Sequence, residues 1–444
     1  MPGQPDPTGS LSRREFMLLS SMAAAGFVIS CATNPVTGKS QLMFISEEEE
    51  IKIDRQYAPV QFSSDYGIVR DPSLNRYVMQ VGQQMADRTH RPQMPFSFQV
   101  VNATYVNAYA FPGGSIAVTR GILLQLDNEA ELSALLGHEL GHVNARHTAQ
   151  QMSKGMLTQA VIGGISVAAG ATLGAGYGQM ASQLGMLGAG ALLASYSRDN
   201  EREADALGLE YTVRNGYGAD GFVGLMDMLR NLSKSKPSYI ELMFATHPMS
   251  EERYQTAVQE VQRNYGENRN RSLYRERYQD NIAGLRKIEG AIDDLQRGEA
   301  DLLNQRYTDA DRHFARALKI APNDYVALVM SAKSNYLQKK YAEALSLARS
   351  AQKVYPEEAQ AWHISGIANI QTRKFEAAYA DFERYDTLLP GNPHTLFFKG
   401  YALEGMDNKE AAADHYYRFL QQVNQGEEPR HAYQRLVEWG YIKQ

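Results

Sequence analysis

The sequence predicts an α+β domain with a small antiparallel sheet, followed by an all-α array of helical repeats. Three observations predict this order: alternating hydrophobic segments between residues 96 and 119, a helix with two histidines after them, and a 34-residue repeat from about residue 289. The 444 residues, 43% of them hydrophobic, are enough for two or three domains. The net charge of −5 and the lack of a basic stripe give no indication of nucleic-acid binding, and none is expected.

The first 30 residues have the composition of an export signal peptide rather than of folded structure. The segment around Arg13 and Arg14 matches the twin-arginine export pattern, and the apolar run that follows is too short for a membrane span. The run ends in Val-Ile-Ser-Cys, which resembles a bacterial lipobox, so we expect cleavage before Cys31 and lipidation of this residue. This predicts a periplasmic lipoprotein, and Ala32 in place of an aspartate favours the outer membrane. The alternative for this single cysteine is a buried free thiol.

Two helices are predicted before the sheet. Ser46 and Glu49 form a capping-box pattern that opens the first helix. Asp71 and Pro72 open the second. Hydrophobic residues recur in this second helix every three to four positions, which predicts a core-facing stripe. The stripe consists of Leu74, Val78, Val81 and Met85.

Three strands are predicted next. Hydrophobic residues alternate from Phe96 to Val101, a second strand runs through Val106 to Ala110, and a third occupies Ser115 to Thr119. The Pro-Gly-Gly stretch between the second and third strands predicts a turn. We expect these strands to form the antiparallel sheet.

The motif His-Glu-x-x-His at residues 138–142 predicts a metal-binding helix. His138 and His142 lie four residues apart, so both imidazoles can reach one metal ion from one helix face. Zinc suits them because it takes neutral imidazole nitrogen and keeps a position open when three protein ligands are supplied. Glu139 can then take a proton from a metal-activated water. Asp127 is the expected N-cap of this helix, and the competing interpretation is a helix that carries two histidines by chance.

The third ligand must come from another segment. His147 lies nine residues after His138, half a turn out of phase on the same helix. The metzincin pattern is also excluded, because it requires a glycine and a histidine where this chain has Ala145 and Thr148.

A carboxylate on a later helix completes the site. Glu201 and Asp205 lie four residues apart and share a helix face, whereas Glu203 points away. We predict that Glu201 binds the metal and that Asp205 orients a histidine. The alternative is the solvated, charged beginning of a helix.

These two helices and the segment Asn-Ala-Tyr-Ala-Phe-Pro-Gly-Gly at residues 107–114 resemble the HtpX/CAAX-prenyl-protease family of zinc metallopeptidases, in particular its periplasmic, BepA-like branch with C-terminal TPR repeats. The resemblance implies a zincin-like domain of the gluzincin type, with one Zn²⁺ per chain held by His138, His142 and Glu201. It also implies that Glu139 activates water for peptide-bond hydrolysis. Misfolded or stalled outer-membrane proteins are the clients that it implies.

The same resemblance assigns roles to two further segments. An edge strand would pair with the main chain of the substrate; the alternative is an ordinary hairpin. That strand comprises Asn107, Ala108, Tyr109, Ala110 and Phe111. His247 would approach the zinc, either to stabilise the oxyanion or to hold an inactive state. Arg253 would anchor the same region through carboxylates.

Residues 155–197 contain no charged side chain over 43 positions, of which ten are glycine. The glycines and several polar residues interrupt the apolar run. We therefore expect two closely packed helices that are buried or cover the site, in which case they would act as a gate. The alternative is a hairpin within the membrane.

From about residue 289 the sequence repeats every 34 residues. Alanine recurs at Ala310, Ala344, Ala378 and Ala412. In the first three repeats an aromatic residue stands three positions before the alanine and a proline follows later, which is the TPR pattern. In the fourth repeat Lys409 replaces the aromatic residue, as expected of a degenerate capping repeat. We expect a protease domain at 31–265, a helical connector at 266–288 and a TPR domain at 289–444 with a concave surface for a polypeptide partner.

The leading hypothesis is a lipid-anchored, periplasmic zinc metalloendopeptidase. A second hypothesis is a TPR-based chaperone or assembly factor for outer-membrane proteins, in which proteolysis is gated or minor. A third, an integral membrane protease that acts on lipidated peptides, depends on the apolar segment after Lys154.

Overall fold

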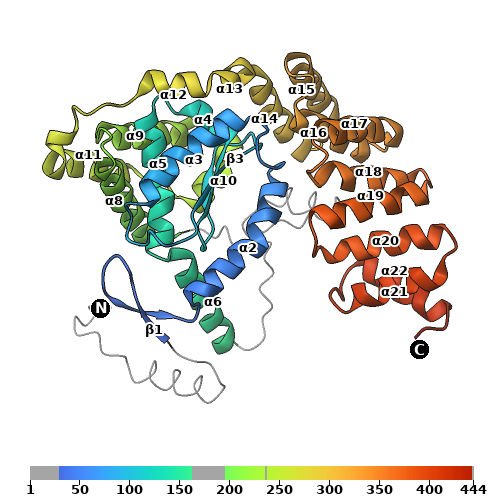
Figure 1. Ribbon diagram of the computed structural model, residues 1–444. Coiled ribbons are helices and arrows are strands. Elements are labelled where there is room, and N and C mark those ends of the chain that lie inside the picture. The colour runs from blue at the N-terminus through green and yellow to red at the C-terminus, as the bar shows by residue number, and fades with distance from the viewer. Residues whose placement is uncertain (1–29, 163–195, 236–237, 443–444) are drawn as a thin grey trace.

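The computed structural model describes residues 30–162, 196–235 and 238–442. Figure 1 shows a mixed domain around a small sheet and, beside it, an array of paired helices in orange and red. The export signal and most of the glycine-rich segment, with the helices predicted there, lie outside the described residues. Among the helices that are described, none is long and apolar enough to cross a membrane.

The described chain begins with a short hairpin, in which β1 (Ser30–Thr33) pairs antiparallel with β2 (Ser40–Met43). The two predicted helices follow and are confirmed. α2 (Glu47–Ser64) begins at the capping box, and α3 (Pro72–Ala86) begins after its Asp71 N-cap. The predicted stripe of α3 is buried in the core of the domain.

The sheet is mixed rather than antiparallel. β3 (Ser97–Val101), β4 (Ala108–Ala110) and β5 (Ser115–Thr119) correspond to the three predicted segments. Their order is β3-β5-β4, with β3 parallel and β4 antiparallel to β5. The predicted antiparallel sheet is therefore wrong. Alternating hydrophobicity locates strands, but it does not say which strands are neighbours, and here β5 lies between the two strands that precede it.

α5 (Glu129–Asn144) carries the His-Glu-x-x-His motif and is buried along its whole length. Its N-cap is Asn128, so the predicted Asp127 is wrong by one residue. The Asn128 side chain accepts a hydrogen bond from the Glu131 N–H, whereas Asp127 donates its own N–H to the Glu131 carboxylate. Both residue types are good N-caps, which is why the sequence alone does not separate them.

One hydrophobic core joins α3, the sheet and α5 to later helices. These are α4 (Arg120–Gln125), α8 (Arg198–Arg214), α9 (Asp220–Ser235), α10 (Glu241–Thr246) and α11 (Glu251–Asn264). α6 (His147–Ile162) packs on β2 of the hairpin. Segment 266–288 forms α12 (Arg275–Asn281) and α13 (Ala283–Lys287), whose Tyr278 and Leu285 are buried in the same core.

The remaining helices confirm the predicted TPR array. They pair as α14 (Glu289–Leu303) with α15 (Tyr307–Ile320), α16 (Tyr325–Leu337) with α17 (Tyr341–Val354), α18 (Gln360–Gln371) with α19 (Phe375–Leu388), and α20 (Pro393–Gly405) with α21 (Lys409–Leu420); α22 (Glu427–Glu438) follows. The alanines of the repeat are fully buried, as expected of the positions where paired helices touch.

Polar contacts dock the array on the first domain. Arg120, at the start of α4, forms a buried ion pair of 2.5 Å with Asp324, which also caps α16. On the same side of the array, Lys333 lies over the ring of Tyr66 and donates a hydrogen bond to Gln360 of α18. This face of α16 and α18 is therefore covered by the chain's own first domain.

Removing one partner of the buried ion pair should destabilise the docked chain. We expect Arg120→Ala to lower the free energy of unfolding by about 3–5 kcal/mol, because Asp324 stays buried without its counter-ion. Arg306→Ala is the matched control: the Arg306 side chain is 57% exposed beside Asp301, so its loss should cost less than about 1 kcal/mol. Urea denaturation measures both, and equal losses would contradict the role given to Arg120.

Candidate metal centre

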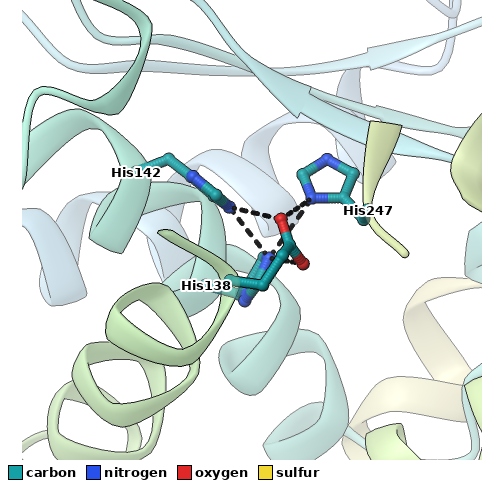
Figure 2. A group of neighbouring side chains, drawn as sticks. His138, His142 and His247 are labelled. Atoms are coloured by element: carbon teal, nitrogen blue, oxygen red, sulfur yellow. Dashed lines mark hydrogen bonds and ion pairs between the residues drawn. The ribbon is translucent and has the colours of Figure 1, made fainter. Parts of the chain in front are cut away.

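Three imidazoles and a carboxylate meet between α5, α8 and the end of α10. His138 and His142 come from α5, Glu201 comes from α8, and His247 directly follows α10. All four are buried, and each offers a donor atom that lies within 4.8 Å of the others. Figure 2 shows the three imidazoles turned toward one another. The structure thus brings His247 together with the three predicted metal ligands.

Four of the distances between the donor atoms are close to those of a tetrahedral metal site. His138 Nε2 lies 3.1 Å from His142 Nε2 and 3.4 Å from His247 Nδ1. Glu201 Oε1 lies 3.4 Å from His142 Nε2 and 3.1 Å from His247 Nδ1. Ligands about 2.0–2.1 Å from a tetrahedral zinc are about 3.4 Å from one another. The residues present therefore fit a divalent metal ion, and nitrogen with one carboxylate oxygen is a donor set that zinc accepts.

The backbones of α5 and α8 nearly touch at the site. A Cβ on Gly137 would lie 2.9 Å from the Gly208 carbonyl oxygen, and a Cβ on Gly141 would lie 3.0 Å from the backbone of Ala204. Only glycine allows so close an approach. The glycines inside the motif therefore set the helix separation that brings Glu201 to the two histidines. The sequence-based prediction assigned no role to these glycines.

Asp205 and Arg253 hold two of the ligands from behind. Asp205 Oδ1 lies 3.0 Å from His138 Nδ1, so a proton on that nitrogen would face the carboxylate and leave Nε2 free for a metal. Arg253 donates hydrogen bonds of 2.7 Å to both Asp205 oxygens, and its Nη1 lies 2.6 Å from Glu201 Oε2. Burial by itself raises the pKa of Asp205, but the charge of Arg253 and the hydrogen bonds outweigh it and hold the pKa below its usual value.

Glu139 lies beside the donor atoms with its carboxylate buried. Its Oε1 is 3.9 Å from His247 Nε2, and its Oε2 has no hydrogen-bond partner among the described residues. Burial raises the pKa of Glu139, although His247 and His138 oppose this shift. A buried carboxylate with a raised pKa and a free oxygen is suited to exchange a proton with water.

Comparison with known protein families identifies the domain that contains this site. Residues 72–261, which contain all four donors and Glu139, match the model of Peptidase family M48. This segment is an M48 peptidase domain. The predicted zincin-like α+β fold is thereby confirmed, with the mixed sheet as its correction.

Several named relatives are similar to part of this chain. The beta-barrel assembly-enhancing protease of Yersinia pestis is 29% identical over 231 residues, which are 50% of this chain and 46% of that protein. Metalloprotease YcaL of Escherichia coli K12 is 35% identical over 161 residues, 36% of this chain and 60% of that protein. The chain spans about half the length of the first curated relatives it matches. Among solved structures, the match to the TPR protein YrrB covers 46% of this chain and 97% of that chain at 14% identity, with a TM-score of 0.32.

His247 of the M48 domain is flanked by an aromatic residue that the sequence did not single out. Tyr196 stacks on the ring of His142, with ring centroids 3.8 Å apart. Its N–H donates a hydrogen bond to the carbonyl of Thr246, the residue before His247. Tyr196 therefore links the segment that carries His247 to a histidine of the motif.

His147 occupies a different position from the predicted one. The prediction of one continuous helix is wrong, because α5 ends at Asn144, Arg146 adopts a left-handed conformation with φ of 61°, and His147 begins α6. This turn places the His147 ring against His142, with their Nδ1 atoms 2.9 Å apart. Glu203 points away from the donor atoms, as predicted, and meets His147 instead. The sequence signal for this contact was a histidine five residues after the motif.

The predicted substrate strand coincides with β4, an outer strand of the sheet order. Its residues from Asn107 to Phe111 are buried. The hydroxyl of Tyr109 donates a hydrogen bond to Asp65, which packs this side of the strand against the end of α2. Asn107 differs from its neighbours, because neither atom of its side-chain amide has a hydrogen-bond partner among the described residues. Buried amides in folded proteins are nearly always paired.

The candidate ligands predict how much zinc the purified chain and its variants hold. We expect the purified chain to bind about one zinc ion. Glu201→Gln should lose most of it, because a neutral amide replaces the anionic ligand, whereas His247→Ala should keep it because three ligands remain. Glu210→Gln, on the partly exposed part of α8, is the matched control. Zinc content after dialysis measures the effect, and loss of metal in His247→Ala alone would contradict the assignment.

Proposed function

We propose that the chain is a zinc-dependent metalloendopeptidase of the bacterial periplasm that degrades misfolded or stalled proteins of the outer membrane. The observation that carries the proposal is the group of four buried donors with Glu139 beside it, inside an M48 peptidase domain. The relatives' names, a beta-barrel assembly-enhancing protease and a metalloprotease, support proteolysis and an envelope client.

Glu139 would move the proton in the reaction. When bound, zinc polarises the peptide carbonyl and lowers the pKa of water to about 7. Glu139 would accept a proton from the attacking water with its unpaired oxygen and then pass it to the leaving amine. A pKa raised by burial suits both steps, because the same carboxyl group must first take the proton and then release it.

His247 would hold the resting site closed. A catalytic zinc site keeps one position for water or substrate, whereas four protein ligands leave none. His247 Nδ1 lies 3.1 Å from Glu201 and 3.4 Å from His138, which is where a fourth ligand belongs. Movement of the segment after α10 would free that position. The released imidazole could then donate a hydrogen bond to the oxyanion, which is the second role expected of it.

A peptide substrate would add to the sheet along β4. Strand addition satisfies the main-chain groups of an extended peptide with little regard to its side chains, which suits a protease of many clients. The unpaired amide of Asn107 supports this position, because both its donor and its acceptor could bind a peptide main chain.

Lipidation of Cys31 would anchor the mature chain to the outer membrane from the periplasmic side. The division into a protease domain at 31–265, a connector at 266–288 and a TPR domain at 289–444 leaves the array to recruit a client or partner. Because the first domain covers one face of α16 and α18, a partner would have to use another part of the array.

The alternative function is a TPR-based assembly factor in which proteolysis is gated or minor. The closed arrangement of His247 is the observation that favours it, since a site with four protein ligands is inactive until it opens. A catalytically dead chain separates the two proposals: an assembly factor would keep its cellular role without Glu139, and a protease would not.

Replacing the proposed base should separate metal binding from cleavage. We expect Glu139→Gln to keep zinc and to lower casein cleavage about 10²–10⁴-fold, because the amide cannot take up a proton. Zinc content and release of casein peptides are measured on the same preparation. Glu131→Gln, on the same helix but at its N-terminal end, is the control. Undiminished cleavage by Glu139→Gln would contradict its role as base.

Replacing Asn107 with an apolar residue should lower activity without lowering stability. We expect Asn107→Leu to lower kcat/KM for peptides at least tenfold while the melting temperature stays equal or rises, because two unpaired buried polar atoms are removed. Calorimetry and peptide cleavage give the two values. Asn102→Leu is the control, because its amide does donate to backbone carbonyls and its loss should lower the melting temperature. A destabilised Asn107→Leu with normal kcat/KM would contradict the substrate role.

A further inference from the structure

We propose that His147 and Glu203 form a relay that fixes the proton of His142 and thereby directs Nε2 of this histidine to the metal. His147 is a positioning residue, because it touches a ligand and not the reacting atoms. The inference rests on the proposed metal function of the site. His142 would thus be oriented through a second histidine, whereas His138 contacts the Asp205 carboxylate directly.

The two ring nitrogens of His142 face different partners. Nε2 faces the other donor atoms, 3.1 Å from His138 Nε2 and 3.4 Å from Glu201 Oε1. Nδ1 faces His147 Nδ1 at 2.9 Å. A neutral imidazole has one N–H and one lone pair. If Nε2 is to offer its lone pair to a metal, the proton of His142 must therefore lie on Nδ1.

The proton of His147 is then fixed as well. The N–H on Nδ1 of His142 points at Nδ1 of His147, so this second nitrogen must be the acceptor and the His147 proton must lie on Nε2. That Nε2 lies 3.2 Å from Glu203 Oε2. An ionised carboxylate only accepts hydrogen bonds. A single arrangement of protons thus satisfies the three groups: His142 donates to His147, and His147 donates to Glu203.

Asn34 fixes the outer end of the relay. Its Oδ1 accepts hydrogen bonds from the N–H groups of Val36 and Thr37, at 2.8 and 3.1 Å. This orientation leaves the amide nitrogen to face Glu203 Oε1 at 3.4 Å. Each carboxylate oxygen of Glu203 thus faces one nitrogen, Oε1 that of Asn34 and Oε2 that of His147. The amino-terminal hairpin therefore supports the metal site through Glu203.

The polar contacts of His147 indicate that its ring does more than fill space in the core. The His147 side chain is fully buried, yet both of its ring nitrogens have polar partners. A ring that only filled the core would need none, and an apolar ring would avoid the cost of burying polar atoms. Partners that orient a metal-binding histidine typically change metal affinity when they are removed.

The zinc affinity of the full chain, measured by competition with a chelator, tests the relay. His147→Phe keeps a ring but removes the acceptor, and we expect binding to weaken about 10–100-fold. His147→Asn places an acceptor oxygen close to the position of Nδ1 and should restore most of the loss. Glu203→Gln retains an acceptor and should weaken binding less than His147→Phe. His313→Phe is the control, because His313 of the TPR array also binds a carboxylate but lies outside the site.

A second measurement needs no metal. ¹⁵N NMR of the metal-free chain labelled at histidine should show His142 with its proton on Nδ1, and His147→Phe should lose this preference.

Wild-type zinc affinity in His147→Phe, or equal losses in the Phe and Asn variants at unchanged melting temperature, would overturn the relay. If the parent chain binds no zinc, the proposed function fails, and the NMR result alone decides the relay. If His147→Phe does not fold, Glu203→Leu replaces it, and unchanged zinc affinity there would overturn the proposal.

Discussion

The small separation of α5 and α8 is the constraint on which the metal site depends. Glu201 is distant in sequence from the two histidines and can join them only where the helix backbones nearly touch. Gly137, Gly141 and Gly208 allow this contact, because a Cβ on any of them would meet backbone atoms of the other helix at 2.9–3.0 Å. A larger side chain at the crossing would push the helices apart and remove the carboxylate from the donor set.

Around this crossing, the three predicted metal ligands are each held by a segment other than their own helix. Asp205 of α8 contacts His138 of α5, and Arg253 of α11 contacts Glu201 of α8. His147, at the start of α6, contacts His142. Charges interact more strongly in the interior than at the surface, and a buried donor that loses its acceptor is costly. The geometry of the site is therefore a property of the whole domain, and the motif helix supplies only part of it.

Local patterns in the sequence predicted local structure well, because their physical cause lies within one or two turns of chain. The Ser46 capping box and the Asp71 helix start are patterns of this kind. The 34-residue repeat is longer, but its regularity reveals the packing of neighbouring helix pairs. The sheet order and the docking of Lys333 on Tyr66 depend on contacts between distant segments, and no local pattern encodes them. That His138, His142 and Glu201 lie together was predictable because motif spacing and family resemblance agreed. The His147 contact was not, since it depends on a helix break at Arg146, whose side chain contacts Glu50 and the Ile45 carbonyl, both distant in sequence.

The most direct test of the account is X-ray absorption at the zinc edge of the purified, zinc-loaded chain. We expect a first coordination sphere of four light atoms at about 2.0–2.1 Å, with the scattering pattern of three imidazoles and one carboxylate oxygen. In His247→Ala the imidazole count should fall to two while zinc stays bound. A six-coordinate oxygen sphere, or a spectrum that is the same in the parent and in His247→Ala, would contradict the four-ligand resting site.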